Sequence, residues 1–106
     1  MNPVADIPVF DSPEVDIPVV DIIVPVFNER DNLPDLLARL RALPGFAQCH
    51  LIFVDNASTD GSVEFSQSVV DATVIRHKHN RGYGASLRSG IAAAKTEQIV
   101  IIDADC

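Results

Sequence analysis

The chain has 106 residues, enough for one compact domain but short for an enzyme that must hold two substrates. Apolar residues make up 47% and charged residues 22%, which is the balance of an ordinary globular protein and excludes a disordered or fibrous one. The formal net charge of -7 argues against a nucleic-acid partner, although a small phosphorylated ligand can still bind if a divalent cation neutralises its charge.

Cysteine usage and hydropathy suggest a compartment. Cys49 and Cys106 lack C-x-x-C spacing, so we expect no disulfide framework. The acidic, proline-rich start differs from a secretory signal, and there is no run of about 18 apolar residues that could span a bilayer. We therefore expect a cytoplasmic protein and leave open a position at the membrane surface.

Residues 1–18 predict an extended, proline-rich arm. The phrase DIPV occurs at 6–9 and again at 16–19, and prolines recur every five residues, a spacing that excludes a helix. A repeat this short does not indicate a solenoid. The folded domain is therefore expected to span residues 19–106.

A strand and a helix are predicted next. Residues 19–26 form the β-branched apolar run VVDIIVPV, which predicts a buried strand stopped by Pro25. The helix should be capped by Asp31 or Asn32 and closed by Pro44-Gly45. Its leucines recur at i, i+3, i+4 and i+7, which predicts one buried face: Leu33, Leu36, Leu37, Leu40 and Leu43.

The remaining elements alternate between strand and helix. Strands are predicted at 50–54, 72–76 and 97–102, the last also buried, and helices at 62–70 and from about 85 to 95. The order βαβαβαβ predicts an α/β fold, a parallel sheet with helices on both faces. Ligands of such sheets bind at the carboxyl ends of the strands, where the polar loops of this chain fall.

Carboxylates follow three of the predicted strands: Glu29 the first, Asp55 the second, Asp103 and Asp105 the fourth. In a doubly wound sheet they would surround one crevice, whereas the alternative is that Asp55 and Asp103 only cap neighbouring turns. Asp103 and Asp105 stand at i and i+2, so in extended geometry both point to one side. Mg²⁺ and Mn²⁺ take one or two such carboxylates together with substrate phosphates, which predicts a divalent-cation site.

A glycine-containing loop, Asn80-Arg81-Gly82-Tyr83-Gly84, precedes the third predicted helix. It does not follow the first strand, as the dinucleotide fingerprint requires, and the chain has no Walker motif. Gly82 and Gly84 allow a close backbone approach to a ligand, or they form an ordinary tight turn. Arg81 is the basic group placed to meet a diphosphate or a base.

The histidines and two of the serines are expected to serve structure. His50, His77 and His79 lack the spacing of metal ligands, which favours structural or surface roles. Ser58 and Ser86 lie in no nucleophile motif, and we expect them only to cap turns or helices. The sequence therefore assigns no nucleophile.

Four ordered segments resemble the family 2 glycosyltransferases: Ile23–Glu29, Phe53–Gly61, Asn80–Gly84 and Asp103–Asp105. The resemblance covers nearly all of the chain beyond the arm. Within the family, the motif N-R-G-Y-G-A at residues 80–85 is most similar to that of the polyprenyl-phosphate sugar transferases of the dolichol-phosphate mannose synthase type. It implies the N-terminal, donor-binding half of a nucleotide-diphospho-sugar transferase fold.

The resemblance also implies roles for residues around the nucleotide. Pro25, Phe27 and Glu29 would line its pocket, and Asp55 would read the base. The implied donor is a GDP- or UDP-sugar, and the implied acceptor is a lipid phosphate.

The D-x-D motif would hold the metal. Asp103 would face the ribose or sugar and Asp105 the metal, with both as candidate ligands of Mg²⁺ or Mn²⁺ and with Ala104 beside the nucleotide. Two departures from the family pattern stand out. Asn56 occupies a place where many members have a second acidic residue, and the chain stops at Cys106, before the further metal ligand that the polyprenyl-phosphate branch supplies.

Two alternatives remain open. The chain can be a catalytically inactive fragment that holds the nucleotide weakly or not at all, and we expect these 106 residues alone to be inactive, because any general base and the acceptor-side residues would lie downstream. An uncovered sheet edge of such a fragment could pair with a second copy. A flavodoxin-like or receiver-type signalling domain also places acidic residues at strand ends, but it has no use for the P-V-F-N-E and N-R-G-Y-G loops.

Overall fold

The computed structural model describes residues 18–105, so residues 1–17 of the expected arm and Cys106 lie outside the described part. Strands and helices alternate in the predicted order: β2 (Val20–Val26), α1 (Leu33–Arg41), the 3-10 helix η3 (Phe46–Gln48), β3 (Cys49–Asn56), α2 (Ser62–Gln67), β4 (Ala72–His77), α3 (Tyr83–Ala92) and β5 (Ile99–Ile101). Among residues 18–105, none of the helices has the length and hydropathy needed to cross a membrane.

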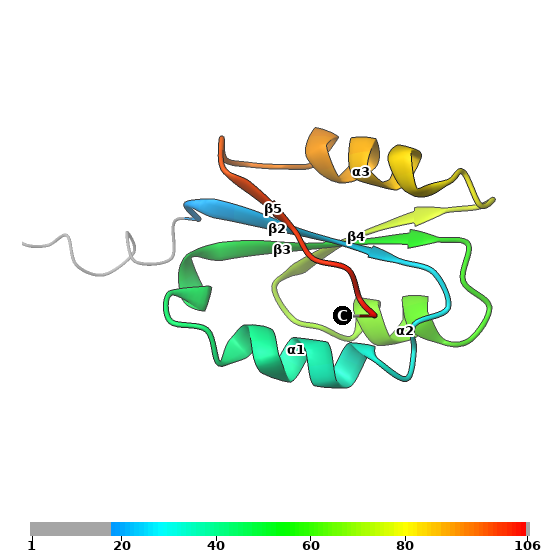
Figure 1. The fold of residues 1–106 in the computed structure, drawn as a ribbon, viewed down its shortest axis with the longest axis horizontal. Coiled ribbons are helices and arrows are strands. Elements are labelled where there is room, and N and C mark those ends of the chain that lie inside the picture. Colours follow the sequence, from blue (N-terminus) through cyan, green and yellow to red (C-terminus); the bar gives the residue numbers. More distant parts are fainter. Residues whose placement is uncertain (1–17, 106) are drawn as a thin grey trace, which may run out of the picture.

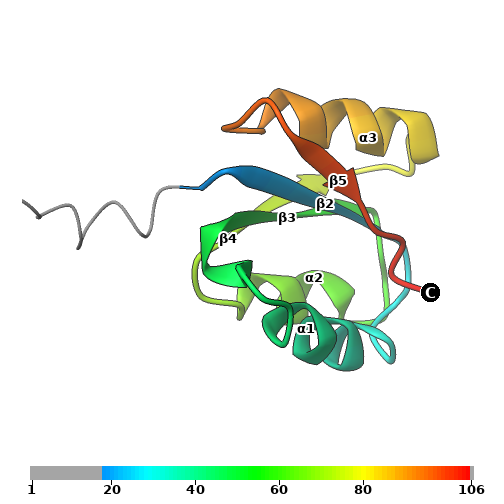
Figure 2. The same cartoon turned by 60° about the vertical axis from the view of Figure 1, so that its left-hand side comes forward.

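The strands form one parallel sheet in the order β4-β3-β2-β5. α1 and α2 cover one face and α3 covers the other (Figure 1, Figure 2), which confirms the predicted fold class. From β2 the chain adds β3 and β4 on one side and then returns to place β5 on the other side of β2. The strand order therefore reverses at β2, the place where ligands of doubly wound sheets bind.

The larger apolar core lies between the sheet and the two helices α1 and α2. Leu33, Leu36, Leu37 and Leu40 are buried there, as the leucine stripe predicts. Leu43 is not: α1 ends at residue 41, and the Leu43 side chain beyond the last turn is 49% exposed. The expected side-chain cap is also missing, because no side-chain hydrogen bond caps the first turn of α1.

α3 lies very close to the opposite face of the sheet. The layer beneath it is thin and consists of buried Ile23, Ile52 and Val54, with Ile75 packed against them. Gly90 permits this approach, because a Cβ atom at that position would stand 2.6 Å from Ile23 Cγ2. This contact sets the distance between α3 and the strands that carry the site.

β2 continues past Pro25, so the expectation that this proline stops the strand is wrong. The Asp21 N–H donates to the carbonyl of Gln98 on the β5 side, and alternate residues of a strand direct their N–H groups to the same neighbour. The missing N–H of Pro25 therefore faces the β5 side. Pairing with β5 ends at Ile23 and Ile101, so the proline costs no hydrogen bond of the ladder.

β5 is exposed, which corrects the expectation of a buried fourth strand. Its residues Ile99, Val100 and Ile101 are 37%, 45% and 42% exposed. The physical reason is its place at the edge of the sheet, where among the described strands it pairs only with β2. Its apolar side chains alone could not reveal that position.

A buried polar cluster lies at the amino end of β2. Asp21 is paired with His50 in the register of β2 and β3, and Asp21 Oδ1 lies 2.7 Å from His50 Nδ1. The amides of Lys95 and Thr96 and the Thr96 hydroxyl also donate to the Asp21 carboxylate. His50 Nε2 lies 2.7 Å from Thr73 Oγ1. The cluster fixes the connection from α3 to β5 and hence where β5 begins.

Candidate functional site

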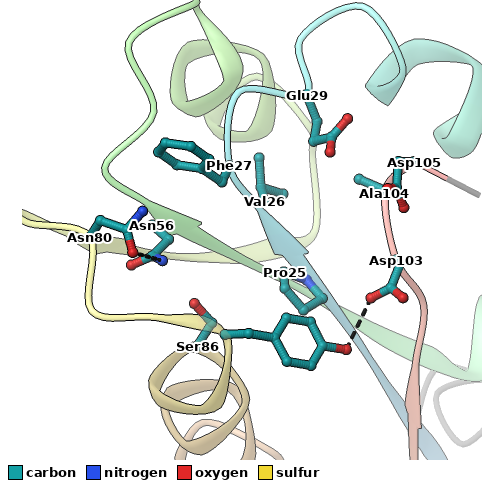
Figure 3. A pocket seen from close by; sticks show the side chains of 11 residues that line it. Pro25, Val26, Phe27, Glu29, Asn56, Asn80, Ser86, Asp103, Ala104 and Asp105 are labelled. Atoms are coloured by element: carbon teal, nitrogen blue, oxygen red, sulfur yellow. Dashed lines mark hydrogen bonds between the residues drawn. The ribbon is translucent and has the colours of Figure 1, made fainter.

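A cavity of about 380 Å³ lies at the carboxyl ends of β2 and β5, at the point where the strand order reverses (Figure 3). Its lining residues come from the ends of β2 and β3, from the loops that follow β2, β4 and β5, and from the first turn of α3. These residues line it: Pro25, Val26, Phe27, Glu29, Asn56, Asn80, Tyr83, Ser86, Asp103, Ala104 and Asp105.

Most residues singled out from the sequence meet at this cavity. The lining includes Pro25, Phe27, Glu29, Asp103, Ala104 and Asp105. Asp55 and Arg81 are not part of it: Asp55 is completely buried, and the Arg81 side chain is exposed. The sequence assigned no ligand-binding role to five further residues that line the cavity. All of them except Ser86 lie inside the four motif segments: Val26, Asn56, Asn80, Tyr83 and Ser86.

The loop after β2 is fastened to the loop after β3. Asn28 adopts a left-handed conformation with φ of 52°, its N–H donates to Ser58 Oγ over 2.9 Å, and its Oδ1 accepts the Thr59 N–H over 2.8 Å. The Glu29 N–H donates to Ser62 Oγ over 2.9 Å. These contacts give most of the polar residues at 28–29 and 56–61 a structural role, because they fix the backbone from which Glu29 reaches the cavity.

Asp60 adds further hydrogen bonds between the loops that follow β2 and β3. Its Oδ2 accepts the Arg30 N–H over 3.0 Å, and its Oδ1 accepts the amide and the hydroxyl of Ser62. Burial raises the pKa of Asp60, but the hydrogen bonds from Ser62 and Arg30 outweigh burial and hold the pKa below its usual value. The Arg30 guanidinium lies 4.9 Å from the ring centre of Phe65, which ties the loop to α2.

Asp55 has one carboxylate oxygen without a partner. Oδ2 accepts the Ser58 N–H over 3.0 Å, as in a capped turn, whereas Oδ1 has no hydrogen bond although the residue is 0% exposed. A buried acceptor left unpaired is costly, by about 1–3 kcal/mol. Capping therefore accounts for one oxygen of Asp55 and leaves the other without a donor from the described residues.

The D-x-D segment follows β5 in a turn. β5 ends at Ile101 and residues 104–105 form a turn, so strand alternation does not set the direction of the two carboxylates. Both nevertheless line the cavity, with buried Ala104 between them (Figure 3). The Tyr83 hydroxyl donates to Asp103 Oδ1 over 3.0 Å and thereby connects this segment to the start of α3.

The donor atoms at the D-x-D segment suit a hard cation only in part. Asp103 and Asp105 offer carboxylate oxygens, the ligand type that Mg²⁺ and Mn²⁺ prefer. Within residues 18–105, however, no group of three or more His, Cys, Asp or Glu side chains is arranged to hold a metal. An ion here would need further oxygens from its ligand, as Mg²⁺ commonly takes from phosphates.

The glycine-containing loop leads into α3, whose first turn faces the cavity through Tyr83 and Ser86. Gly82 has φ of 89°, a conformation that favours glycine, whereas Gly84 does not have a positive φ. The Ser86 hydroxyl donates to the Gly82 carbonyl over 3.3 Å. Ser86 therefore bonds to the turn, as expected, and also lines the cavity.

The histidines occupy the expected structural and surface positions. His50 and His77 are buried in hydrogen-bonded positions, and His79 is exposed. Burial lowers the pKa of His77, the positive charge of Arg81 lowers it further, and Asp55 partly offsets both. The lowered pKa favours the neutral imidazole of His77 at neutral pH.

Comparison with protein-family models matches residues 21–106 to Glycosyl transferase family 2. The chain is 35% identical over 91 residues to the undecaprenyl-phosphate 4-deoxy-4-formamido-L-arabinose transferase of Pseudomonas fluorescens, a match that covers 79% of this chain and 27% of the relative. It is also 35% identical over 91 residues to the dolichol-phosphate mannosyltransferase of Saccharomyces cerevisiae, covering 79% and 34%. The chain thus spans roughly a quarter to a third of the length of these relatives.

Solved structures show the same fold. A mannosyltransferase from Pyrobaculum calidifontis, in complex with GDP-Man and Mn²⁺, superimposes with a TM-score of 0.63 and 27% identity, over 84% of this chain and 28% of that one. TarS from S. aureus superimposes with a TM-score of 0.67 over 82% of this chain and 27% of that one, but at 22% identity it supports the fold alone. The matches confirm the resemblance that the four motifs indicated.

Proposed function

Because this chain belongs to glycosyl transferase family 2, we propose that it is the donor-binding part of a metal-dependent transferase that moves a sugar from a nucleotide diphosphate to a polyprenyl phosphate. One observation carries the proposal: Phe27, Glu29, Asp103 and Asp105, from two loops far apart in sequence, line a single cavity at the reversal of the strand order. The alternative of a receiver-type signalling domain is set aside, because residues 21–106 match the model of glycosyl transferase family 2.

The nucleotide would be held by an apolar surface and a buried acceptor. The Phe27 side chain lines the cavity and is 47% exposed, so a flat base can cover it and remove apolar area from water. Asp55 Oδ1 lacks a donor, and an N–H group of a base would supply one. Guanine and uracil both carry such a group, which keeps GDP- and UDP-sugars as the candidate donors.

Asp103 and Asp105 would hold the metal together with the diphosphate. Mg²⁺ and Mn²⁺ both fit the oxygen donors, and the Mn²⁺ and GDP-Man in the P. calidifontis mannosyltransferase support a divalent ion at this fold. When bound, such an ion stabilises the negative charge of the leaving diphosphate. The Tyr83 hydroxyl holds Asp103 in place, and Ala104, which is 4% exposed, packs the segment against the core.

The acceptor is proposed from the relatives and from its chemistry. The relatives are named for undecaprenyl-phosphate and dolichol-phosphate, which are lipid phosphates. A phosphomonoester has a second pKa of about 6 and is largely ionised at neutral pH, so it needs little help from a general base. We assign no general base in this chain, and we place the parent enzyme at the cytoplasmic membrane surface, where such an acceptor lies.

The exposed β5 strand favours a second candidate, a binding fragment without catalytic activity. An apolar strand edge without charges is prone to pair with another chain, here a second copy of this one. The chain also spans only 27% of its P. fluorescens relative. We therefore expect nucleotide binding from this chain and no sugar transfer.

Calorimetry tests the donor site. The wild type is titrated with Mn²⁺ and then with GDP or UDP in its presence. Asp105→Ala should abolish the metal-dependent part of nucleotide binding. Asp55→Asn keeps the acceptor for Ser58 but places an NH₂ group where the free oxygen stands, and it should weaken nucleotide binding by about tenfold or more without changing the affinity for Mn²⁺ alone.

The matched control is Asp35→Asn, because Asp35 lies on the exposed side of α1, where it pairs with Arg39. Its binding should equal that of the wild type. Unchanged nucleotide affinity in both Asp105→Ala and Asp55→Asn would refute the proposed site.

A further inference from the structure

Two buried side chains, Asn56 and His77, link the sheet to the loop beside the cavity. The Arg81 N–H donates to Asn56 Oδ1 over 2.9 Å, and the Gly82 N–H donates to Asn80 Oδ1 over 2.9 Å. A backbone N–H can only donate, so both side-chain oxygens are fixed as acceptors. Asn56 Nδ2 must then be the group that faces Asn80 Oδ1 at 2.8 Å (Figure 3).

The acceptor role of Asn56 Oδ1 also fixes the tautomer of His77. Its Nδ1 lies 3.1 Å from Asn56 Oδ1, which is an acceptor, so Nδ1 carries the proton and donates. In the neutral ring Nε2 then accepts from the hydroxyl of Ser89, 2.8 Å away on α3. The connection therefore runs from Ser89 on α3 through His77 on β4 and Asn56 on β3 to the loop.

The surroundings of His77 keep this arrangement in one state. The imidazole is 5% exposed, and the charged groups that act on it are Arg81 from the loop and Asp55 from β3. Burial and Arg81 hold its pKa below the usual value, so the ring stays neutral and keeps one proton, on Nδ1. A neutral donor at Nδ1 is what Asn56 Oδ1 requires.

We propose that His77 is a positioning residue for the cavity: through Asn56 it holds the loop at residues 80–82 in the shape that the bound donor nucleotide needs. Asn56 and Asn80 line the cavity and His77 does not, so His77 acts only through them. The link to the nucleotide rests on the donor function proposed above, whereas the link to the loop does not.

The relay also explains why residue 56 is an amide. An aspartate there would set two acceptor oxygens against each other at the 2.8 Å that now separates Asn56 Nδ2 from Asn80 Oδ1. It would also place a carboxylate beside His77 Nδ1, which favours the protonated imidazole. A second carboxylate at this position is therefore incompatible with the loop as it stands.

Two variants of nearly equal size separate positioning from general stability. In His77→Asn the amide nitrogen can occupy the place of Nδ1, so the donor to Asn56 is kept and the contact with Ser89 is lost. In His77→Gln the amide reaches the place of Nε2, so the contact with Ser89 is kept and the donor to Asn56 is lost. If His77 only stabilised the fold, there would be no reason for His77→Gln to loosen the loop at residues 80–82 more than His77→Asn does.

The experiment uses the full 106-residue chain and three measurements. Nitrogen NMR of the wild-type imidazoles should show His77 neutral with its proton on Nδ1. Hydrogen exchange without ligand should be about tenfold faster at the Arg81 and Gly82 amides in His77→Gln than in His77→Asn. GDP or UDP binding with Mn²⁺ should weaken by a similar factor in His77→Gln only, while the affinity for Mn²⁺ alone stays constant in both.

The outcomes separate this proposal from the donor function. A proton on Nε2 in the wild type would overturn the relay even if neither variant folds. Equal amide exchange in the two variants would also overturn it. If exchange follows the prediction but the wild type binds neither nucleotide, the donor function fails, while the hold of His77 on the loop is supported.

Discussion

The buried carboxylate of Asp21 offers the sharpest stability prediction. It is 0% exposed and accepts hydrogen bonds from Thr96, from the Lys95 amide and from His50. Burial alone would raise its pKa, but these hydrogen bonds outweigh burial and lower the pKa from 3.8 to about 2. Because the folded-state pKa lies below the unfolded one, the ionised carboxylate stabilises the fold above pH 3.8, and this stabilisation is lost as the pH falls towards 2.

The magnitude follows from the two pKa values. A fall from 3.8 to about 2 corresponds to about 2.4 kcal/mol, at about 1.36 kcal/mol per pKa unit. Asp21→Asn has nearly the shape of the protonated carboxyl, so the free energy of unfolding of the wild type should exceed that of the variant by about 2 kcal/mol or more at pH 7. The difference between the two proteins should shrink by about 2 kcal/mol between pH 5 and pH 2, because at pH 2 half of the folded-state carboxylates are protonated.

Urea unfolding followed by far-ultraviolet circular dichroism measures this difference at each pH. The control is Asp35→Asn, because the Asp35 side chain is 69% exposed and its carboxylate pairs with Arg39 at 3.0 Å on the outside of α1. Its urea midpoint should match that of the wild type at every pH, since exposed pairs contribute little. A wild-type advantage over Asp21→Asn that stays constant from pH 5 to pH 2 would refute the reasoning.

Two further predictions concern α3. Gly90→Ala should lower the free energy of unfolding by about 1–3 kcal/mol in thermal or urea denaturation, because its Cβ would meet Ile23 Cγ2 at 2.6 Å. Gly84→Ala should cost less, because the nearest atom there is the flexible end of Arg88 at 3.4 Å. Equal losses in the two variants would contradict the close packing of α3. Tyr83→Phe removes the hydroxyl that donates to Asp103, so calorimetry should show weaker Mn²⁺-dependent nucleotide binding with an unchanged fold; wild-type affinity would contradict that positioning role.

The sequence predicted the sheet because its strands are strongly apolar and alternate with helical segments, of which the first carries a leucine stripe. It could not predict where β5 stands: Ile99, Val100 and Ile101 suit a central strand as well as an edge, and only the order of the strands decides. Pro25 was misjudged for a similar reason. Whether a proline interrupts a strand depends on which neighbour its missing N–H would face, and that is a property of the register.

The site was predictable where its residues follow strand ends, as Glu29 and Asp105 do, because parallel strands bring those ends to one rim. The partners of these residues were not predictable. Tyr83 meets Asp103 across 20 residues of sequence, and His77 meets Asn56 across 21, only because the connections through α3 and α2 return the chain to the same rim. The sequence alone gave His77 no role beyond structure.

The most direct test of the donor-site proposal is an amide-resolved NMR titration of this chain, first with Mn²⁺ and then with GDP or UDP alongside Mg²⁺. The proposal predicts broadening by Mn²⁺ that is centred on Asp103 and Asp105, and nucleotide-induced shifts at Glu29, Asp55 and the loop at residues 80–82. A well-dispersed spectrum in which none of these amides responds would contradict the claim that this chain carries a donor site.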